Sequence, residues 1–379
     1  MLLIKNAVIH NSVSPEAFRG DILVSDGKIA GVAPSIDAPE AEIFDAAGQN
    51  AYPGFVEAHA HTGLHGYGIG YEGADYNEMN DIISPQLRAI DGIQPFDRTL
   101  SEAAGAGVTT LCVGPGSANV LGGTFAVIKP VGKRADDMCI IKEAAMKCAF
   151  GENPKRCYKD KCDSSRMSTA SKLREMLFRA REYAEKLDAA GGDPAKRAAF
   201  DMKLNALVPV IRGEMPLKAH AHQADDMFTA IRIAREFGVR LTLEHCTEGH
   251  LVADELAAEG YPVAVGPTLT HASKFELRNK SWETPGILQR AGCSVSIITD
   301  APVIPQKYLP LCAGLAIQAG MDEFEALKAI TINPARHIGA DARVGSLEVG
   351  KDADIVVMSG NFWDIAGRIS LVLIGGKRI

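Results

Sequence analysis

Apolar and polar residues follow one pattern at the two ends of the chain and another in its middle. The ends carry short apolar runs with no helical period between them, at residues 2–9, 21–32, 354–358 and 371–374. Turn residues such as Asp26-Gly27 bound these runs, which therefore predict strands and hairpins. Because chain termini often lie close together, we expect residues 1–52 and 338–379 to form one small β-sandwich domain.

The middle of the chain, residues 53–337, alternates between two periods. Its strand-like runs are 107–114, 146–151, 217–222, 240–246, 263–265 and 293–300. Helical periods lie between them, at 167–190, 224–237 and 323–330, the last preceded by a predicted N-cap at Asp322. Strands that alternate with helices pair in parallel. Six to eight such units predict an α/β fold, a (β/α)8 TIM barrel.

Two segments of the predicted barrel do not fit a plain strand–helix unit. Residues 115–124 are rich in glycine and are expected to form a loop at the barrel mouth, either flexible or in contact with substrate. They lack the lysine of a phosphate-binding loop, which argues against nucleotide binding. Residues 155–216 are longer than one unit needs, and we expect either a lid over the site or a contact in a homo-oligomer.

Residues that bind metals stand at the ends of the predicted strands. His59-Ala60-His61 and His220-Ala221-His222 each place two imidazoles on one face, because residues i and i+2 of a strand point the same way. His245 and Asp300 end two further apolar runs. The carboxyl ends of barrel strands are where active sites of this fold lie. Several imidazoles and a carboxylate at one point predict a divalent metal site, with zinc the default.

Composition narrows the class of partner. The net charge is −7, which leaves no basic footprint for nucleic acid or an anionic membrane. No apolar stretch reaches the roughly 18 residues of a membrane span, and the apolar start of the chain is too short for a signal peptide. We therefore expect a cytoplasmic protein that acts on a small molecule, with its eight scattered cysteines as free thiols.

Two stretches carry a resemblance to a known family. Residues 53–61, Pro-Gly-Phe-Val-Glu-Ala-His-Ala-His, resemble the first-strand motif of the amidohydrolase superfamily. Residues 331–335 and 345–354 are similar to that family's return from barrel to sandwich. The resemblance covers essentially the whole chain, and it is greatest to the imidazolonepropionase-like and metal-dependent dipeptidase-like group. It implies a metal-bearing barrel with a small β-sandwich built from both chain ends.

The resemblance also assigns roles to single residues. The implied metal ligands are His59 and His61 on strand 1, His220 on strand 5, His245 on strand 6 and Asp300 on strand 8. Glu57 departs from the family, which most often has aspartate there. Its carboxylate can still orient a ligand from behind.

The number of metals depends on a bridging carboxylate. Glu152 follows a strand-like run in a turn and is the bridging candidate, whereas Lys147 and Lys142 are the rival sites for a carboxylated lysine. With a bridge, His220 and His245 bind a second metal. Without a bridge, His220 completes a single-metal site and His245 becomes a catalytic hydrogen-bonding group.

The predicted chemistry is hydrolysis of a C–N bond in an amide or cyclic amide. A metal-activated hydroxide attacks, and Asp300 carries its proton to the leaving nitrogen. His245 or His271 stabilises the oxyanion. His65 and His271, in predicted mouth loops, and His222 are candidates for substrate contact.

Two other classes of function stay open. A single-metal aminohydrolase of a nucleobase-like or imidazole-like ring would release ammonia. A non-catalytic scaffold would keep the barrel and lose its ligands, whereas this chain retains the first-strand pair, both later histidines and the aspartate.

Overall fold

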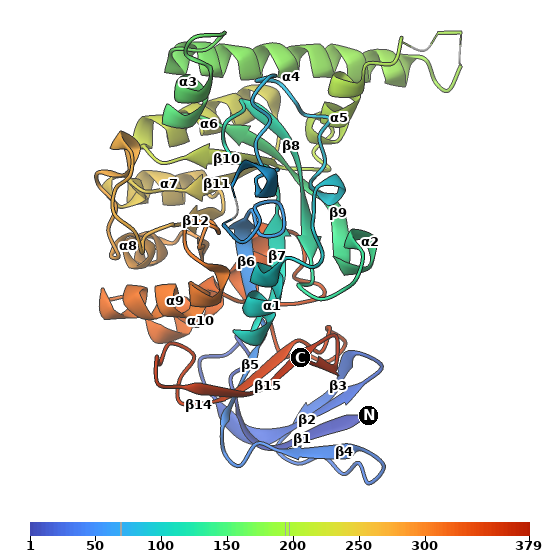
Figure 1. The fold of residues 1–379 in the computed structure, drawn as a ribbon, viewed down its shortest axis with the longest axis vertical. Coiled ribbons are helices and arrows are strands. Elements are labelled where there is room, and N and C mark those ends of the chain that lie inside the picture. Colours follow the sequence, from blue (N-terminus) through green and yellow to red (C-terminus); the bar gives the residue numbers. More distant parts are fainter. Residues whose placement is uncertain (69, 194, 197) are drawn as a thin grey trace.

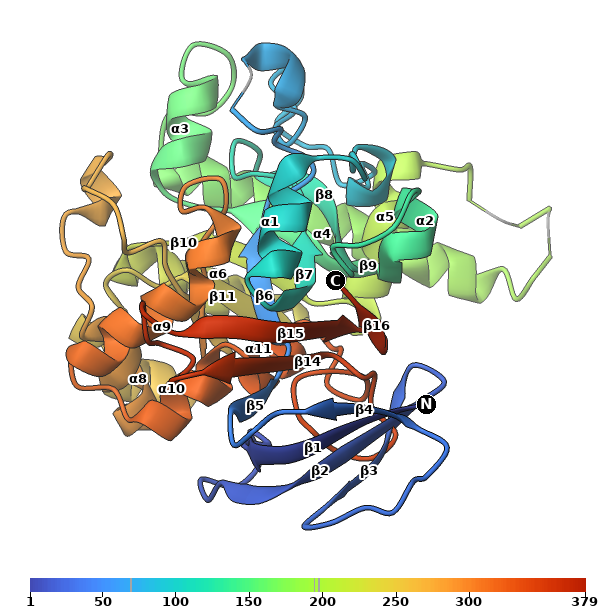
Figure 2. The ribbon, with the colours of Figure 1, turned by 60° about the horizontal axis from the view of Figure 1, so that its bottom comes forward.

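The chain folds around two eight-stranded sheets, one built from its ends and one from its middle. A computed structural model describes residues 1–68, 70–193, 195–196 and 198–379. Strands from both ends lie together below the barrel in Figure 1, and Figure 2 shows them from that side. Among the described residues, none of the helices has the length and apolar character to cross a membrane.

The terminal sheet joins the two ends of the chain directly. Its strands are β1 (Leu2–Ile9), β2 (Phe18–Ser25), β3 (Lys28–Ala33), β4 (Glu42–Asp45), β5 (Asn50–Pro53), β14 (Ile355–Ser359), β15 (Arg368–Ile374) and β16 (Lys377–Arg378). The order is β16-β15-β14-β5-β1-β2-β3, with β4 beside β1. The antiparallel pair β5–β14 connects the N-terminal strands to the C-terminal ones. Asp26-Gly27 forms the predicted hairpin between β2 and β3.

The barrel sheet follows the order of the sequence. Its strands are β6 (Phe55–Ala60), β7 (Val108–Val113), β8 (Leu121–Ile128), β9 (Cys139–Ala149), β10 (Leu217–Ala221), β11 (Leu241–His245), β12 (Val263–Val265) and β13 (Val295–Ile297). Consecutive strands pair from β6 to β13. The sheet nearly closes, and the backbone N–H of His61, just after β6, donates to the carbonyl of Ala301, just after β13, at 2.7 Å.

Strand β8 corrects two expectations. It runs antiparallel to both β7 and β9, so the barrel is not wholly parallel. It also begins inside residues 115–124, which we expected to be a mouth loop. All of its residues are buried, and the backbone N–H of Thr124 donates to the carbonyl of Leu87 at 2.8 Å. Gly123 has φ 110°, and a Cβ there would overlap that same carbonyl, so the glycine permits the close approach.

Periodicity predicted three helices, and these form with differences of a residue or so at their ends. The described residues contain further helices that were not predicted. The helices are α1 (Arg98–Gly105), α2 (Ala135–Met138), α3 (Glu152–Tyr158), α4 (Arg166–Ala189), α5 (Met202–Ile211), α6 (Ala224–Phe237), α7 (Ala253–Glu259), α8 (Thr284–Ala291), α9 (Leu309–Gln318), α10 (Glu323–Ala329) and α11 (Ile332–His337), and the three predicted ones are α4, α6 and α10. Asp322 caps α10 as predicted, because its side chain accepts from the backbone N–H of Glu325. Ser165 and Ser168 form a capping box at the start of α4.

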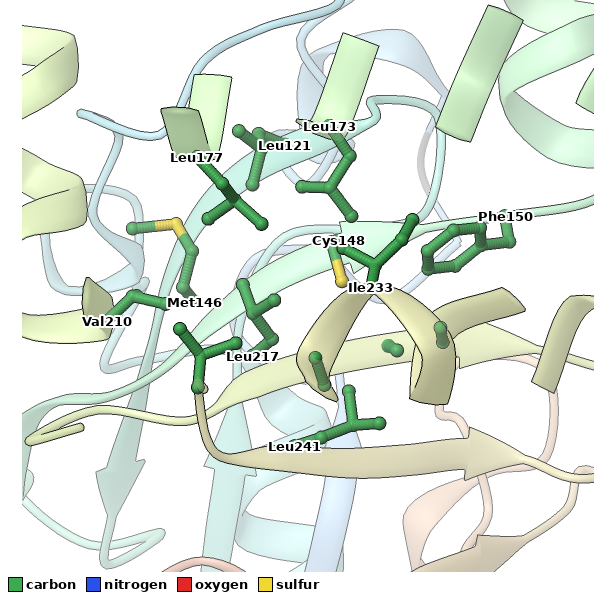
Figure 3. Close-up of a cluster of buried hydrophobic side chains, with 14 of the residues drawn as sticks. Leu121, Met146, Cys148, Phe150, Leu173, Leu177, Val210, Leu217, Ile233 and Leu241 are labelled. Atoms are coloured by element: carbon green, nitrogen blue, oxygen red, sulfur yellow. The ribbon is translucent and has the colours of Figure 1, made fainter. Parts of the chain in front are cut away.

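The largest buried cluster fixes α4 and α6 against the barrel wall. Leu173 and Leu177 of α4 lie with Leu121 of β8 and Met146 of β9 (Figure 3). Full burial of such a side chain stabilises the fold by about 1.5–3 kcal/mol. Residues 155–216 contain three helical segments: the end of α3, the whole of α4, which packs on the barrel, and α5. Residues 194 and 197 of that segment lie outside the described residues, and its role as lid or oligomer contact stays a prediction.

Candidate metal centre

Five predicted metal ligands and His222, a predicted substrate contact, come together at the carboxyl ends of the barrel strands. Strand β6 supplies His59 and leads into His61, and β10 supplies His220 and leads into His222. Strand β11 ends on His245, and Asp300 lies just beyond β13. The donor atoms form two groups, and within each group they all lie within 4.8 Å of one another. One group is His59, His245 and Asp300, and the other is His220, His222 and His245.

His245 belongs to both groups, and its orientation leaves one nitrogen free. Its Nδ1–H donates to the carbonyl of Gly266 at 2.8 Å. Its Nε2 is buried and has no hydrogen-bond partner among the described residues. Burial lowers the pKa of His245 to about 4, which favours the neutral ring with a lone pair on Nε2. A buried lone pair without a donor is costly, and a metal ion between the two groups removes that cost.

The two histidines of β6 are held in the orientation that metal ligands use. His59 Nδ1–H donates to Glu244 Oε2 at 3.1 Å, and His61 Nδ1–H donates to the carbonyl of Gly114 at 2.7 Å. Each bond leaves Nε2 directed towards Asp300 Oδ1, at 3.8 Å from His59 and 3.3 Å from His61. Carboxylates and carbonyls behind metal-bound histidines fix the tautomer in this way.

Asp300 is placed by a strained backbone and charged by its surroundings. Its φ is 52°, which is uncommon for a residue other than glycine and is frequent at functional sites. Burial alone would raise the pKa of Asp300, but His245, His61 and His59 outweigh it and hold that pKa below its usual range. The carboxylate is therefore ionised near neutral pH, as a metal ligand or proton acceptor must be.

Glu57 lies behind this aspartate rather than in the cluster. Its Oε2 accepts from the backbone N–H and the hydroxyl of Thr299 at 3.0 and 2.7 Å, next to Asp300. Its Oε1 accepts from the backbone N–H of His59 at 3.1 Å. Burial raises the pKa of Glu57 to about 7 against these hydrogen bonds. Glu57 thus connects β6 to the segment that follows β13, and its hydrogen bonds hold the backbone at His59 and next to Asp300.

Of the three bridging candidates, the structure places Lys147 beside the cluster. Lys147 is fully buried on β9, and its Nζ lies 3.2 Å from His59 Nε2. Burial lowers the pKa of Lys147 to about 8. Glu152 instead lies on α3, where Oε2 accepts from the backbone N–H of Glu276 at 3.4 Å. Lys142 pairs with Asp136 on the surface.

A buried ionic network behind His59 was missed by sequence reasoning. Glu244 has no exposed surface; its Oε2 lies 3.0 Å from Lys218 Nζ, and its Oε1 accepts from His337 Nε2 at 2.8 Å. Burial alone would raise the pKa of Glu244, but Lys218 and His337 hold it well below its usual range. The signal in the sequence was a charged residue, Lys218 or Glu244, inside each of two fully buried strands. His337 is thus connected to His59 through one carboxylate.

The predicted substrate contacts divide into those near the cluster and those away from it. His222 is buried beside His220 and His245, with Nδ1 2.7 Å from Thr247 Oγ1. His65 lines a groove together with Thr62 and Gln306. It is not among the described residues that line the cavity next to the metal cluster. His271 is exposed and is not among the described residues that line either hollow.

A cavity of about 310 Å³ opens directly onto the cluster. His61, His220, His222 and Asp300 form one side of it. Lys274 and Arg156 lie on its wall, from the segment after β12 and from α3. Glu276, in that same segment, was not anticipated: it is buried, with Oε1 3.5 Å from His220 Nε2. The cavity is the space in which a small molecule can meet the cluster.

This arrangement, a barrel with imidazoles and an aspartate at its carboxyl edge, is typical of metal-dependent hydrolases, and comparison with known proteins gives the family. The sequence profile of the Amidohydrolase family matches residues 50–379. The chain belongs to that family, which supports a hydrolase and a divalent metal.

Individual relatives agree with this assignment. Amidohydrolase tasK of Hapsidospora irregularis is 29% identical over 377 residues, which cover 91% of this chain and 38% of that protein, so the chain spans well under half its length. An imidazolonepropionase of Symbiobacterium thermophilum is 26% identical, over 90% of this chain and 84% of the relative. The crystal structure of an amidohydrolase from Thermotoga maritima MSB8 superimposes with a TM-score of 0.97 at 40% identity, covering 100% of this chain and 99% of the other.

Proposed function

We propose that the protein is a metal-dependent hydrolase that cleaves a C–N bond in a small amide or cyclic amide. The observation that carries this proposal is the position of His245, whose Nε2 has no partner among the described residues and belongs to two groups of donors. Other members of these groups line a cavity. Imidazole nitrogens with one carboxylate are the ligands that zinc prefers in hydrolytic sites.

In this proposal the cluster would hold two zinc ions. His59, His61 and Asp300 would hold one ion, and His220 and His245 would hold the other. Lys147, in a carboxylated form, would supply the shared carboxylate in place of Glu152, because it lies beside the cluster and its lowered pKa favours the uncharged amine that carboxylation needs. When bound, the metal supplies Lewis acidity, which polarises a substrate carbonyl and makes water nucleophilic near neutral pH.

The chain's own residues then place and move the proton. Asp300 accepts a proton at its carboxylate from the attacking water as the new C–O bond forms. It returns that proton to the leaving nitrogen as the C–N bond breaks. Glu57 and the strained backbone keep Asp300 in position, and Glu244 keeps His59 in its tautomer.

We also propose two domains, one of residues 1–52 and 338–379 and one, the catalytic barrel, of residues 53–337. The N-terminal strands of the terminal sheet end with β5 at Pro53, and the barrel strands begin with β6 at Phe55. Helix α11, which contacts β6 and β13, is the last helix of the barrel. The chain then returns to the terminal sheet, where β14 begins at Ile355.

The test is metal analysis with hydrolysis of a panel of N-acyl amino acids, dipeptides, cyclic amides and nucleobases. We expect about two zinc ions per chain and hydrolysis of at least one amide. Asp300→Asn should lower kcat at least about 100-fold, the scale of general acid–base catalysis. Full activity of Asp300→Asn contradicts the role of the aspartate. Ammonia release from a ring substrate, with one metal per chain, would replace the proposal by a deaminase.

A further inference from the structure

The wall of the cavity carries two positively charged side chains. Lys274 and Arg156 both line it, and Asp300, on the cluster side, is the one carboxylate among its described lining residues. The chain as a whole carries a net charge of −7, so this positive wall is a local feature. Opposite charge in a cleft raises the local concentration of a complementary ligand.

Lys274 is fixed in place by two neighbours, the buried Glu276 and the half-buried Asn153. Its Nζ lies 2.5 Å from Glu276 Oε1 and donates to Asn153 Oδ1 at 3.2 Å. Glu276 is anchored in turn, because its Oε2 accepts from the backbone N–H of Glu152 at 2.8 Å. An ammonium group has three N–H donors. Among the described residues, Glu276 and Asn153 engage two, which leaves one for a molecule in the cavity.

Arg156 is less engaged and lies nearer to solvent. Its side chain is 60% exposed, and its contacts are long: 3.4 Å to Asn153 Oδ1 and 4.0 Å to Glu152 Oε1. A guanidinium has five N–H donors in a planar fork that matches a carboxylate. Most of these donors are therefore available at the cavity edge, next to Asn153, which Lys274 also contacts.

We propose that the substrate carries a carboxylate, which Lys274 and Arg156 bind while the scissile C–N bond lies at Asp300. This inference rests on the proposed function. It restricts the substrate class to small amides of amino or related acids, because the cavity measures about 310 Å³. N-acyl amino acids and dipeptides share this chemistry.

The binding test uses probes without a hydrolysable bond, so that it is independent of turnover. The probes are 4-oxo acids, in which CH2 replaces the amide nitrogen of an N-acyl amino acid, and the matched 4-oxo alcohols. Calorimetry on the zinc-loaded protein should show that acids bind at least about 10-fold more tightly than their alcohols, the range for a charge-assisted hydrogen bond. An equal affinity for acids and alcohols overturns the proposal.

Variants then locate the source of this preference. Arg156→Gln and Lys274→Gln should each reduce the acid preference, and the double variant should abolish it. Lys155→Gln, the matched control on the same helix but away from the cavity lining, should keep it. Metal content is measured for each variant, because Lys274 pairs with a carboxylate near His220. A preference that persists in the double variant would place the carboxylate at the metal and overturn the proposal.

Hydrolysis assays separate the two sources of the carboxylate. If N-acetyl amino acids are hydrolysed and dipeptides are not, the bound carboxylate belongs to an N-acyl amino acid. If dipeptides are hydrolysed and N-acetyl amino acids are not, it is the C-terminus of a peptide. Acid preference in binding without hydrolysis of any amide leaves the anion site standing and removes the proposed function.

Discussion

Lys147 Nζ lies 3.2 Å from His59 Nε2, inside the barrel and without exposed surface. If Lys147 bridges two metals, Lys147→Met should lower the metal content from about two ions per chain to one or fewer. Glu152→Gln is the matched control, because it alters the other carboxylate candidate without touching the cluster, and it should keep both ions. Elemental analysis of the purified proteins decides the point. Metal loss in Glu152→Gln but not in Lys147→Met reverses the assignment.

Glu244 should govern metal affinity through His59, although it is not among the described residues that line the cavity. Glu244→Gln removes the charge that balances Lys218 and weakens the hydrogen bond to His59 Nδ1. Substitutions behind a metal ligand typically weaken metal binding about 10- to 100-fold. Competition with a chelator measures this change. Glu259→Gln, which breaks an ion pair with Arg235 on the surface helices, should leave metal affinity unchanged.

The stability of the metal-free protein should depend on pH through Lys147. Its pKa falls from 10.5 to about 8 on folding because the ammonium is buried. Between these values the unfolded chain binds a proton that the folded chain does not, so the free energy of unfolding rises as pH increases from about 8 to 10.5.

The contribution is about 2–3 kcal/mol across that window. Urea unfolding of apo wild type and of apo Lys147→Met, in buffers free of bicarbonate, isolates it. The variant should lack this part of the rise. Parallel pH profiles for the two proteins would show that Lys147 titrates normally.

Gly266 should be sensitive to a single added methyl group. Its φ is 143°, and a Cβ there would overlap the carbonyl oxygen of Ile298. Its own carbonyl accepts from His245 Nδ1. Gly266→Ala should therefore destabilise the protein by about 2 kcal/mol or more and also weaken metal binding.

Gly292→Ala provides the comparison. That glycine also has a positive φ, 104°, but nothing lies within 4 Å of the position of its Cβ. It should show only the backbone cost of about 1 kcal/mol and unchanged metal affinity. An equal loss of metal in both variants would mean that general destabilisation, not the orientation of His245, is responsible.

Sequence periodicity predicted most barrel strands because their apolar runs are continuous. It failed at β8, where Gly122-Gly123 is typical of a turn. In the structure these glycines belong to a strand. Segment 82–88 passes so close to it that a side chain at Gly123 would not fit. Such an approach depends on tertiary packing, which a local pattern does not contain.

The metal cluster was predictable where spacing and strand ends coincide, as in His59 and His61. The choice among the three bridging candidates was not predictable, because which residue of β9 faces inward depends on register. Lys147 pairs in register with Lys218 of β10, and both enter the barrel. Glu276 comes from a loop after β12, where no periodicity indicates which side chain turns inward.

The pairing of β5 with β14 sets an order for folding during synthesis. Strands β1 to β5 leave the ribosome first, whereas β14 follows only after the whole barrel sequence. Until then β5 has an unpaired edge that can template association with other chains. Contacts this distant in sequence form slowly. The edge of β5 therefore stays without its partner strand until the barrel sequence has been translated, and truncation before Ile355 would leave that edge permanently exposed.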